Sequence, residues 1–322
     1  MYEVKERRIM GTPFNWRSYA IYPEVQLEAM EKIKEKGGGI ALEIGGGSGE
    51  NAILLAFAGA EKVYMNELSL QEISTFQQLV KALPTPIAKR LFPIADTCFN
   101  IPNLCPALSG KVRLIICRNV LHLFSDQQQA QFFQLLHTLL EPGGQAILSV
   151  NFPQPVAFYK RAIEQSPDAT FFCAVRCVMV TQNNREVNDQ LHDAFPVSEE
   201  VGRKIPKEMI VYNKERGVKW KKVPDVMGQV PEEIGKAIDE MNEQLFAKET
   251  PGITREGTIQ VFVDSIKMYT KRTLGDLAKQ KGFAVKKTFL VGLEINPGHL
   301  VEEESLAHQI GVIIEKPAQV QP

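Results

Sequence analysis

The chain has 322 residues, with 37 lysines and arginines against 38 aspartates and glutamates, so its net charge at pH 7 is −1. Apolar residues make up 44% and charged residues 23%, as in ordinary soluble globular proteins. These values exclude a coiled coil, a collagen-like chain and a global electrostatic surface for nucleic acid or an anionic membrane. At roughly 100–200 residues per domain, the length predicts two structural units or one domain with a large insertion.

Neither the cysteines nor the N-terminus indicates an exported protein. Five cysteines in 322 residues are too few for a disulfide scaffold, and none has the C-x-x-C spacing of zinc or redox sites. Residues 1–8 are highly charged and lead into no signal-peptide core. The longest apolar stretch, around residues 52–60, is far shorter than the ~20 residues that span a bilayer. We therefore predict a cytoplasmic protein without a membrane span or a bound metal.

Residues 39–150 alternate short β-rich runs with helical patterns, which predicts a parallel sheet covered by helices. Ser69 with Glu72, and Ser125 with Gln128, have the spacing of capping boxes at the starts of two helices. The second of these helices should stop at residues 141–144, because proline cannot continue it. The predicted strands are residues 39–44, 62–66, 90–95, 112–117 and 145–150.

A glycine-rich turn follows the first of these strands and is the segment with the clearest chemistry. Gly45, Gly47 and Gly49 occupy every second position before a helix, where a Cβ would obstruct a backbone that approaches a ligand closely. Glu67 ends the next strand, where a carboxylate can accept hydrogen bonds from ribose hydroxyls. A dinucleotide fingerprint requires a third glycine where this chain has Glu50, whose carboxylate would repel a pyrophosphate. The turn therefore favours an adenosine-type ligand carrying a sulfonium cation.

The regular alternation ends after residue 150. Residues 209–212 and 218–223 are predicted to form a hairpin, and the apolar spacing in residues 231–248 predicts one helix. The stretch 203–222 carries eight basic and two acidic residues, which is either a solvated face or a docking surface for an acidic macromolecule.

The α/β pattern returns near the C-terminus. Thr270 caps a helix that Gly282 closes, and strands are predicted at residues 283–291 and 309–316. The predicted organisation has an N-terminal segment at residues 1–23, one α/β domain at 24–152 and 268–322, and an inserted region at 153–267.

These motifs together resemble the class I S-adenosylmethionine-dependent methyltransferases over roughly half of the chain. The family's acidic-x-G-x-G-x-G pattern is matched at Glu43 to Gly49, its ribose-binding acid at Glu67, and its third-strand acid at Asp96. Its Pro-Gly-Gly signature before the fifth strand is matched at residues 142–144. One departure is Arg113, where the family often has an acid. The stretch from Cys117 to Val120 with Phe124 is similar to one in the chemotaxis-receptor glutamate methyltransferases, in which the asparagine faces the cofactor.

The resemblance implies an α/β fold with a Rossmann-like seven-stranded sheet, mostly parallel with an antiparallel last strand. Helices would cover both faces, and a large α+β insertion would follow the fifth strand. It implies S-adenosyl-L-methionine as the cofactor, with the N-terminal segment covering its site. The implied cofactor-binding residues are Glu43, Gly45, Gly46, Gly47, Gly49, Glu67, Leu68, Asp96, Thr97, Arg118 and Asn119.

Several alternatives about the reaction remain open at this point. His122 is either a general base or a packed residue at a helix start. The methyl acceptor is a small molecule or, if the inserted region is a docking platform, a protein. A non-catalytic module that only binds S-adenosylmethionine is a third possibility.

Overall fold

The computed structural model describes residues 37–151, 168–180, 186–200, 209–213, 258–292, 300–301 and 307–318, together with residues 33, 35 and 166. The chain separates into two compact units by its internal contacts. Unit 1 comprises Met1–Phe152 and Tyr269–Pro322, and unit 2 comprises Pro153–Met268. Each unit is described by itself below.

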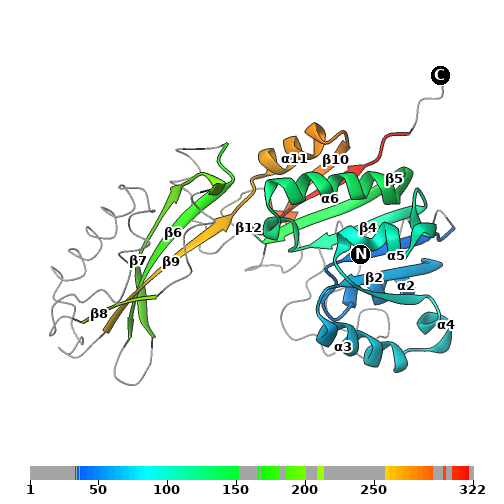
Figure 1. Cartoon of the computed structure of the whole chain (residues 1–322), viewed down its shortest axis with the longest axis horizontal. Helices are drawn as coiled ribbons and strands as arrows, with labels where there is room; N and C mark the ends of the chain where they lie inside the picture. The colour runs from blue at the N-terminus through cyan, green and yellow to red at the C-terminus, as the bar shows by residue number, and fades with distance from the viewer. Residues whose placement is uncertain are drawn as a thin grey trace. The chain divides into compact units, whose positions relative to one another are not determined.

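Unit 1 is built on one mixed sheet (Figure 1) with the strand order β11-β10-β12-β5-β4-β1-β2-β3. Strands β1 to β5 are parallel, β12 is antiparallel to β5, and β10 is antiparallel to β12. This arrangement confirms the predicted seven-stranded Rossmann-like sheet; the two-residue β11 extends its edge. The strands are β1 (Ile40–Ile44), β2 (Lys62–Glu67), β3 (Leu91–Ala95), β4 (Val112–Arg118), β5 (Leu140–Asn151), β10 (Ala284–Gly292), β11 (Leu300–Val301) and β12 (Ala307–Glu315).

Helices begin where the sequence offers caps. Ser125 and Gln128 form the predicted capping box, and Ser69 accepts a hydrogen bond from the Glu72 amide. The described helices are α2 (Glu50–Phe57), α3 (Leu70–Lys81), α4 (Thr85–Ala88), α5 (Ile101–Leu104), α6 (Asp126–Leu139) and α11 (Lys271–Gln280). Short 3₁₀ turns are η2 (Cys98–Asn100), η3 (Pro106–Leu108) and η4 (Leu121–Leu123).

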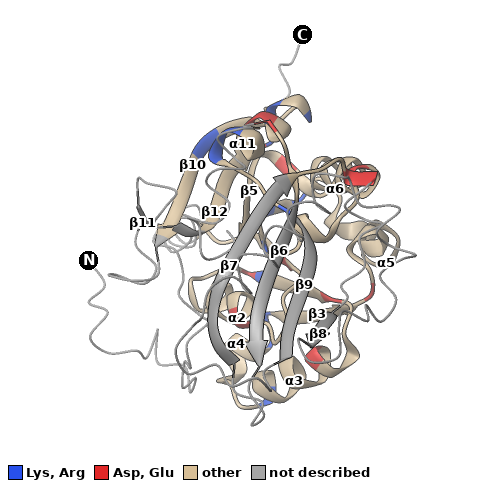
Figure 2. Cartoon of the chain, turned by 90° about the vertical axis from the view of Figure 1, so that its left-hand side faces the viewer, with Lys and Arg blue, Asp and Glu red and all other residues tan. Residues whose placement is uncertain are grey.

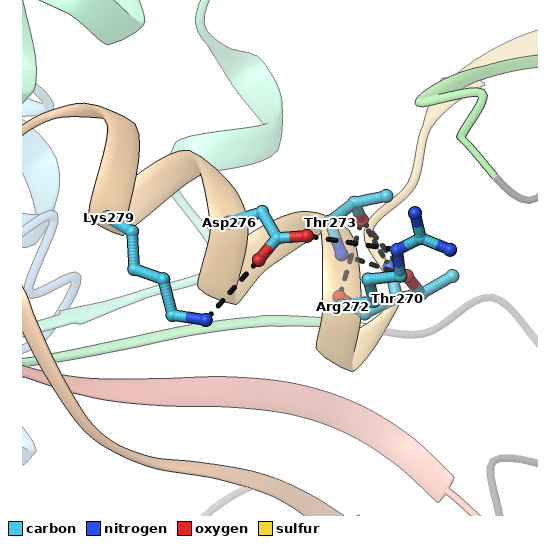
Figure 3. A network of polar contacts seen from close by, with 5 residues as sticks. All are labelled: Thr270, Arg272, Thr273, Asp276 and Lys279. Carbon is cyan, nitrogen blue, oxygen red and sulfur yellow. Dashed lines mark hydrogen bonds and ion pairs between the residues drawn. The ribbon is translucent and has the colours of Figure 1, made fainter.

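The start of α11 has both a threonine cap and ion pairs between exposed side chains (Figure 3). Thr270 accepts from the Thr273 amide at 3.1 Å, and its own amide donates to Thr273 Oγ1 at 2.8 Å. Asp276 then pairs with Arg272 at 3.8 Å and with Lys279 at 3.5 Å. Because these charged side chains are exposed, the ion pairs contribute little, and the threonine cap does more to fix where the helix starts.

Both faces of this sheet are covered. Ala41, Leu114 and Ile147 pack with α2 and α3 in one buried core, while alternate strand residues such as Leu42 and Ile115 are fully buried on the other face. Helices α6 and α11 lie side by side (Figure 1), and a 2.8 Å hydrogen bond joins His137 Nε2 to the Lys281 carbonyl. Parallel sheets typically have both faces covered. A ligand can then reach the sheet only at the ends of its strands.

Arg113, which departs from the family pattern, has a structural partner at each end of its guanidinium. Its Nε lies 2.8 Å from Glu141 Oε1, and its Nη1 donates to the Gly38 carbonyl at 2.7 Å. The arginine thus joins the start of β4 to the turn before β1, at the sheet edge opposite to the glycine-rich turn.

Unit 2 contains a four-stranded antiparallel sheet with the order β7-β6-β9-β8. Its strands are β6 (Phe171–Val180), β7 (Glu186–Pro196), β8 (Met209–Asn213) and β9 (Thr258–Lys267). Lys267 is buried at the end of β9, with Nζ 3.6 Å from Glu199 Oε2. The first arm of the predicted hairpin is β8, which pairs with β9; its second arm (218–223), the predicted helix (231–248) and residues 1–23 lie outside the described residues.

No helix within the described ranges is long and apolar enough to cross a bilayer. The same residues contain no group of three or more histidine, cysteine, aspartate or glutamate side chains placed to hold a metal ion.

Candidate active site

The glycine-rich turn leaves β1 and is tied to the neighbouring strand. The amides of Gly45 and Gly46 both donate to the Asn66 carbonyl of β2, at 2.9 and 3.0 Å. Gly45, Gly47 and Gly49 have φ angles of +67°, +53° and +80°, a region that side chains disfavour. The backbone therefore requires glycine at each alternate position that the sequence supplies.

The surroundings of these glycines differ in a way that identifies the open side of the turn. A Cβ at Gly45 would lie 2.3 Å from Val120, and one at Gly49 would lie 2.2 Å from the ring of Phe76. A Cβ at Gly47 would meet no atom within 4 Å. The first and last glycines are thus needed for packing, whereas Gly47 presents bare backbone towards open space.

Glu43 is a buried anchor for α2. Its carboxylate accepts hydrogen bonds from Asn51 Nδ2 at 2.6 Å and from the Ala52 amide at 2.8 Å. Burial raises its pKa to about 7, although these two hydrogen bonds and the charge of Arg118 act in the opposite direction. Both carboxylate oxygens are therefore engaged with α2, and the group holds a proton for part of the time at neutral pH.

Glu67 lies beside the open part of the turn. Its Oε2 accepts from the Gly47 amide at 2.9 Å, and its Oε1 accepts from the amides of Leu68 and Ser69 at 2.8 and 2.9 Å. Leu68 itself is 72% exposed, so the end of β2 offers an apolar side chain next to an oriented carboxylate.

Asp96 follows β3 and is held by hydrogen bonds in a fixed position. Its Oδ1 accepts from the Thr97 amide at 2.6 Å, and its Oδ2 accepts from Asn100 Nδ2 at 2.8 Å. The backbone carbonyl of Asp96 accepts from Asn66 Nδ2 at 2.7 Å. The carboxylates of Asp96 and Glu67 thus stand at the ends of adjacent parallel strands.

The end of β4 carries the third group of polar residues. Among the described residues, Asn119 is the only one other than glycine with a positive φ, at +56°. Its amide donates to the Ser149 carbonyl of β5 at 2.8 Å, while Asn119 Oδ1 and His122 Nδ1 are buried without a hydrogen-bond partner. Burial also lowers the pKa of His122. Buried polar atoms are normally paired, so these two mark a place where a ligand could supply the partner.

Arg118 ends β4 on the same edge. Burial raises the pKa of Glu50 at the start of α2, and the positive charge of Arg118 opposes that rise. Because Arg118 also acts on Glu43, it counters two acidic groups beside the turn.

Residues 41–144, about a third of the chain, match a family model described as a methyltransferase domain. This segment contains the glycine-rich turn, both oriented carboxylates, nearly all of β1, and strands β2 to β4, and these strands lie in the order β4-β1-β2-β3. The chain carries a methyltransferase domain at residues 41–144. It is accordingly an enzyme.

A comparison with curated protein sequences finds no match. Solved structures similar to the chain include the glycopeptide N-methyltransferase MtfA complexed with S-adenosyl-L-homocysteine, at 12% identity and a TM-score of 0.46 over 94% of this chain and 91% of that one. Another is an S-adenosylmethionine dependent methyltransferase from Mesorhizobium loti, at 14% identity and a TM-score of 0.43 over 90% of this chain and 97% of that one. The assignment of the methyltransferase domain rests on the family model and on the geometry of its own residues.

Every site residue predicted from the sequence lies on β1 to β4 or in the turns at their carboxyl ends. Since β3, β2, β1 and β4 are consecutive and parallel in the sheet, the structure brings these residues together along the carboxyl ends of the four strands. Ligands of open α/β sheets bind at this edge. The contacts of each residue with a cofactor remain predictions.

Two residues that support the site through hydrogen bonds were not predicted from the sequence. Asn51 supplies a hydrogen bond to Glu43, and Asn66 joins the glycine-rich turn to the end of β3. A signal existed for Asn66, because asparagine is uncommon within a strand and here directly precedes the predicted ribose-binding acid.

Proposed function

We propose that this enzyme transfers the methyl group of S-adenosylmethionine to a small-molecule acceptor. The observation that carries the proposal is the pairing of Gly47 and Glu67. Bare backbone faces open space there, and an oriented carboxylate lies 2.9 Å from the Gly47 amide. A Cβ would fill this cradle, which explains the glycine, and the carboxylate suits the hydroxyls of a ribose.

The residues present fit the cofactor. Glu67 would accept hydrogen bonds from the ribose hydroxyls, Leu68 would cover the adenine, and Asp96 with Thr97 would bind its polar edge. The glycine-rich turn would lie against the methionine portion, supported from behind by Glu43. When bound, S-adenosylmethionine supplies a methyl group on a sulfonium, which is activated for in-line transfer to a nucleophile.

On the acceptor side, Asn119 and His122 would border the transfer point. Burial lowers the pKa of His122 and so favours the neutral imidazole, whose unprotonated ring nitrogen can take a proton from the acceptor. Asn119 Oδ1, buried without a partner, can accept a hydrogen bond that fixes the orientation of an acceptor or of the cofactor. Orientation is the larger contribution expected here, because the leaving group needs no protonation.

A small acceptor is favoured by the charge distribution. The net charge is −1, and Figure 2 shows the acidic and basic residues of the described part scattered over several elements rather than gathered in one band. We propose that the inserted region, residues 153–267, selects the acceptor and that residues 1–23 cover the cofactor. The protein-acceptor alternative depends on Lys219, Lys221 and Lys222, which lie outside the described residues.

The experiment supplies S-adenosylmethionine labelled in its methyl group to the enzyme with a cell extract divided by dialysis into small molecules and macromolecules. Label entering the small-molecule fraction supports the proposal, and Gly47→Glu, which would fill the cradle, serves as the inactive control. Label entering only protein would establish the protein-acceptor alternative. Cofactor binding without transfer to either fraction would contradict catalysis and favour a binding module.

A further inference from the structure

Asn66 connects three strand ends of the site through one residue. It lies on β2, between β1 and β3, and is only 3% exposed. Its carbonyl accepts from the amides of Gly45 and Gly46 in the turn after β1. Its side-chain Nδ2 donates to the carbonyl of Ile94 on β3, at 3.3 Å, and to that of Asp96 directly after β3, at 2.7 Å.

The contacts with the Ile94 and Asp96 carbonyls require a hydrogen-bond donor in the side chain at position 66. Both partners on β3 are carbonyl oxygens, which only accept hydrogen bonds, so the amide of Asn66 must present its two N–H groups to them. A carboxylate in the same place would set negative charge against two carbonyl dipoles, and an aliphatic side chain would leave the buried Ile94 carbonyl and the partly buried Asp96 carbonyl without this donor.

The contact at Asp96 extends into the predicted adenine site. The Asp96 carbonyl is held by Asn66, while the Asp96 carboxylate is held by Thr97 and Asn100. Asn66 also directly precedes Glu67, the predicted ribose ligand. The side chain of Asn66 therefore ties the end of β2, where Glu67 stands, to the residue that carries the second carboxylate.

We propose that Asn66 is a positioning residue for the cofactor, which sets the spacing between Glu67 and Asp96 that the ribose and adenine require. This inference rests on the proposed function, because it concerns the same site. Asn66 acts through Asp96 and does not touch the ligand. The tie between the glycine-rich turn and β2 uses only the backbone of Asn66, so side-chain substitutions should disturb the adenosine end and spare the turn.

The test measures binding of S-adenosylhomocysteine and of adenosine by isothermal titration calorimetry, from pH 5.5 to 8.5, with wild type, Asn66→Asp and Asn66→Ala. We expect Asn66→Ala to bind both ligands roughly tenfold more weakly, as for loss of one buried hydrogen bond. Because the adenosine end is affected, the factor should be equal for the two ligands. Asn103→Asp, which makes the same chemical change at an exposed neighbour that donates to Asn100, should bind within about twofold of wild type.

Asn66→Asp adds a readout that a purely structural role would not move. At low pH the introduced carboxyl is protonated and can donate to the Asp96 carbonyl, whereas at high pH it repels that carbonyl. The ratio of variant to wild-type Kd should therefore fall by roughly tenfold as the pH is lowered. The neighbouring carboxyl groups of Glu43, Glu67 and Asp96 are present in both proteins, so the ratio isolates the new group.

The outcomes separate this inference from the proposed function. If wild type binds neither ligand, the proposed function fails, and the positioning role fails with it. If wild type binds and Asn66→Ala binds equally well, or the ratio for folded Asn66→Asp is constant with pH, the positioning role is wrong and the proposed function stands. Should Asn66→Asp not fold, Asn66→Ala decides the question alone.

Discussion

Glu43 gives the site a pH-dependent effect on stability whose sign is informative. Burial raises the pKa of Glu43 from 4.5 to about 7, against two hydrogen bonds and Arg118, which lower it. Between pH 4.5 and 7 the unfolded chain therefore releases a proton that the folded protein retains. The folded state is favoured by this group at low pH, and the advantage is lost as the pH rises through that window.

The size of the effect follows from the shift. Each pH unit in the window lowers the free energy of unfolding by about 1.4 kcal/mol, which gives a total of about 3 kcal/mol. Glu43→Gln keeps one oxygen acceptor, which can serve the Ala52 amide, and has no proton to lose. The free energy of unfolding of this variant minus that of wild type should therefore increase by about 3 kcal/mol as the pH is raised from 4.5 to 8.

Urea unfolding followed by circular dichroism at several pH values measures this difference, and the other titrating groups cancel in it. Asn51→Ala removes one hydrogen bond that lowers the pKa of Glu43, so in that variant the window should extend to higher pH. A constant difference between Glu43→Gln and wild type would refute the reasoning. A difference of opposite sign would show that the hydrogen bonds outweigh burial.

Three further predictions concern packing and the cradle. Gly49→Ala should destabilise the fold by at least about 2 kcal/mol in urea unfolding, because a Cβ at φ +80° would overlap Phe76; wild-type stability would contradict this. Gly47→Ala should cost only about 1 kcal/mol of stability, because its Cβ meets nothing, yet weaken S-adenosylhomocysteine binding in calorimetry at least tenfold. Lys316→Met removes an ammonium that donates to the His137 and Leu140 carbonyls, at 2.7 and 2.8 Å, and should lower the unfolding free energy by roughly 1–3 kcal/mol. Lys316→Arg should retain most of it.

The elements of unit 1 were predictable because local signals agree with the tertiary fold. Each strand from β1 to β4 is an apolar run bounded by turn residues, and the predicted caps at Ser69, Ser125 and Thr270 are present. The start of β5 was placed at residue 145, but the strand begins at Leu140. The reason is long-range: Leu140 pairs with Val112, and Gly143 and Gly144 exchange backbone hydrogen bonds with Lys316.

The positions of the site residues were predictable from glycine and acidic residues at strand ends, but their partners were not. The resemblance implied that Glu43 is a cofactor-binding residue, but it did not predict that both carboxylate oxygens accept hydrogen bonds from α2. The bond from Asn66 to Asp96 joins residues 30 positions apart, and only the register of β2 with β3 brings them together. Such contacts depend on strand order, which no local pattern contains.

The most direct test of the central claim is calorimetric titration of the wild-type chain with S-adenosylmethionine, S-adenosylhomocysteine and NADH, alongside Gly47→Glu. Wild type should bind S-adenosylmethionine and S-adenosylhomocysteine at one site and should not bind NADH. Gly47→Glu, in which a charged side chain fills the cradle, should bind none of the three. Binding of NADH, or undiminished binding of S-adenosylmethionine by Gly47→Glu, would contradict the assignment of this turn to a sulfonium nucleoside.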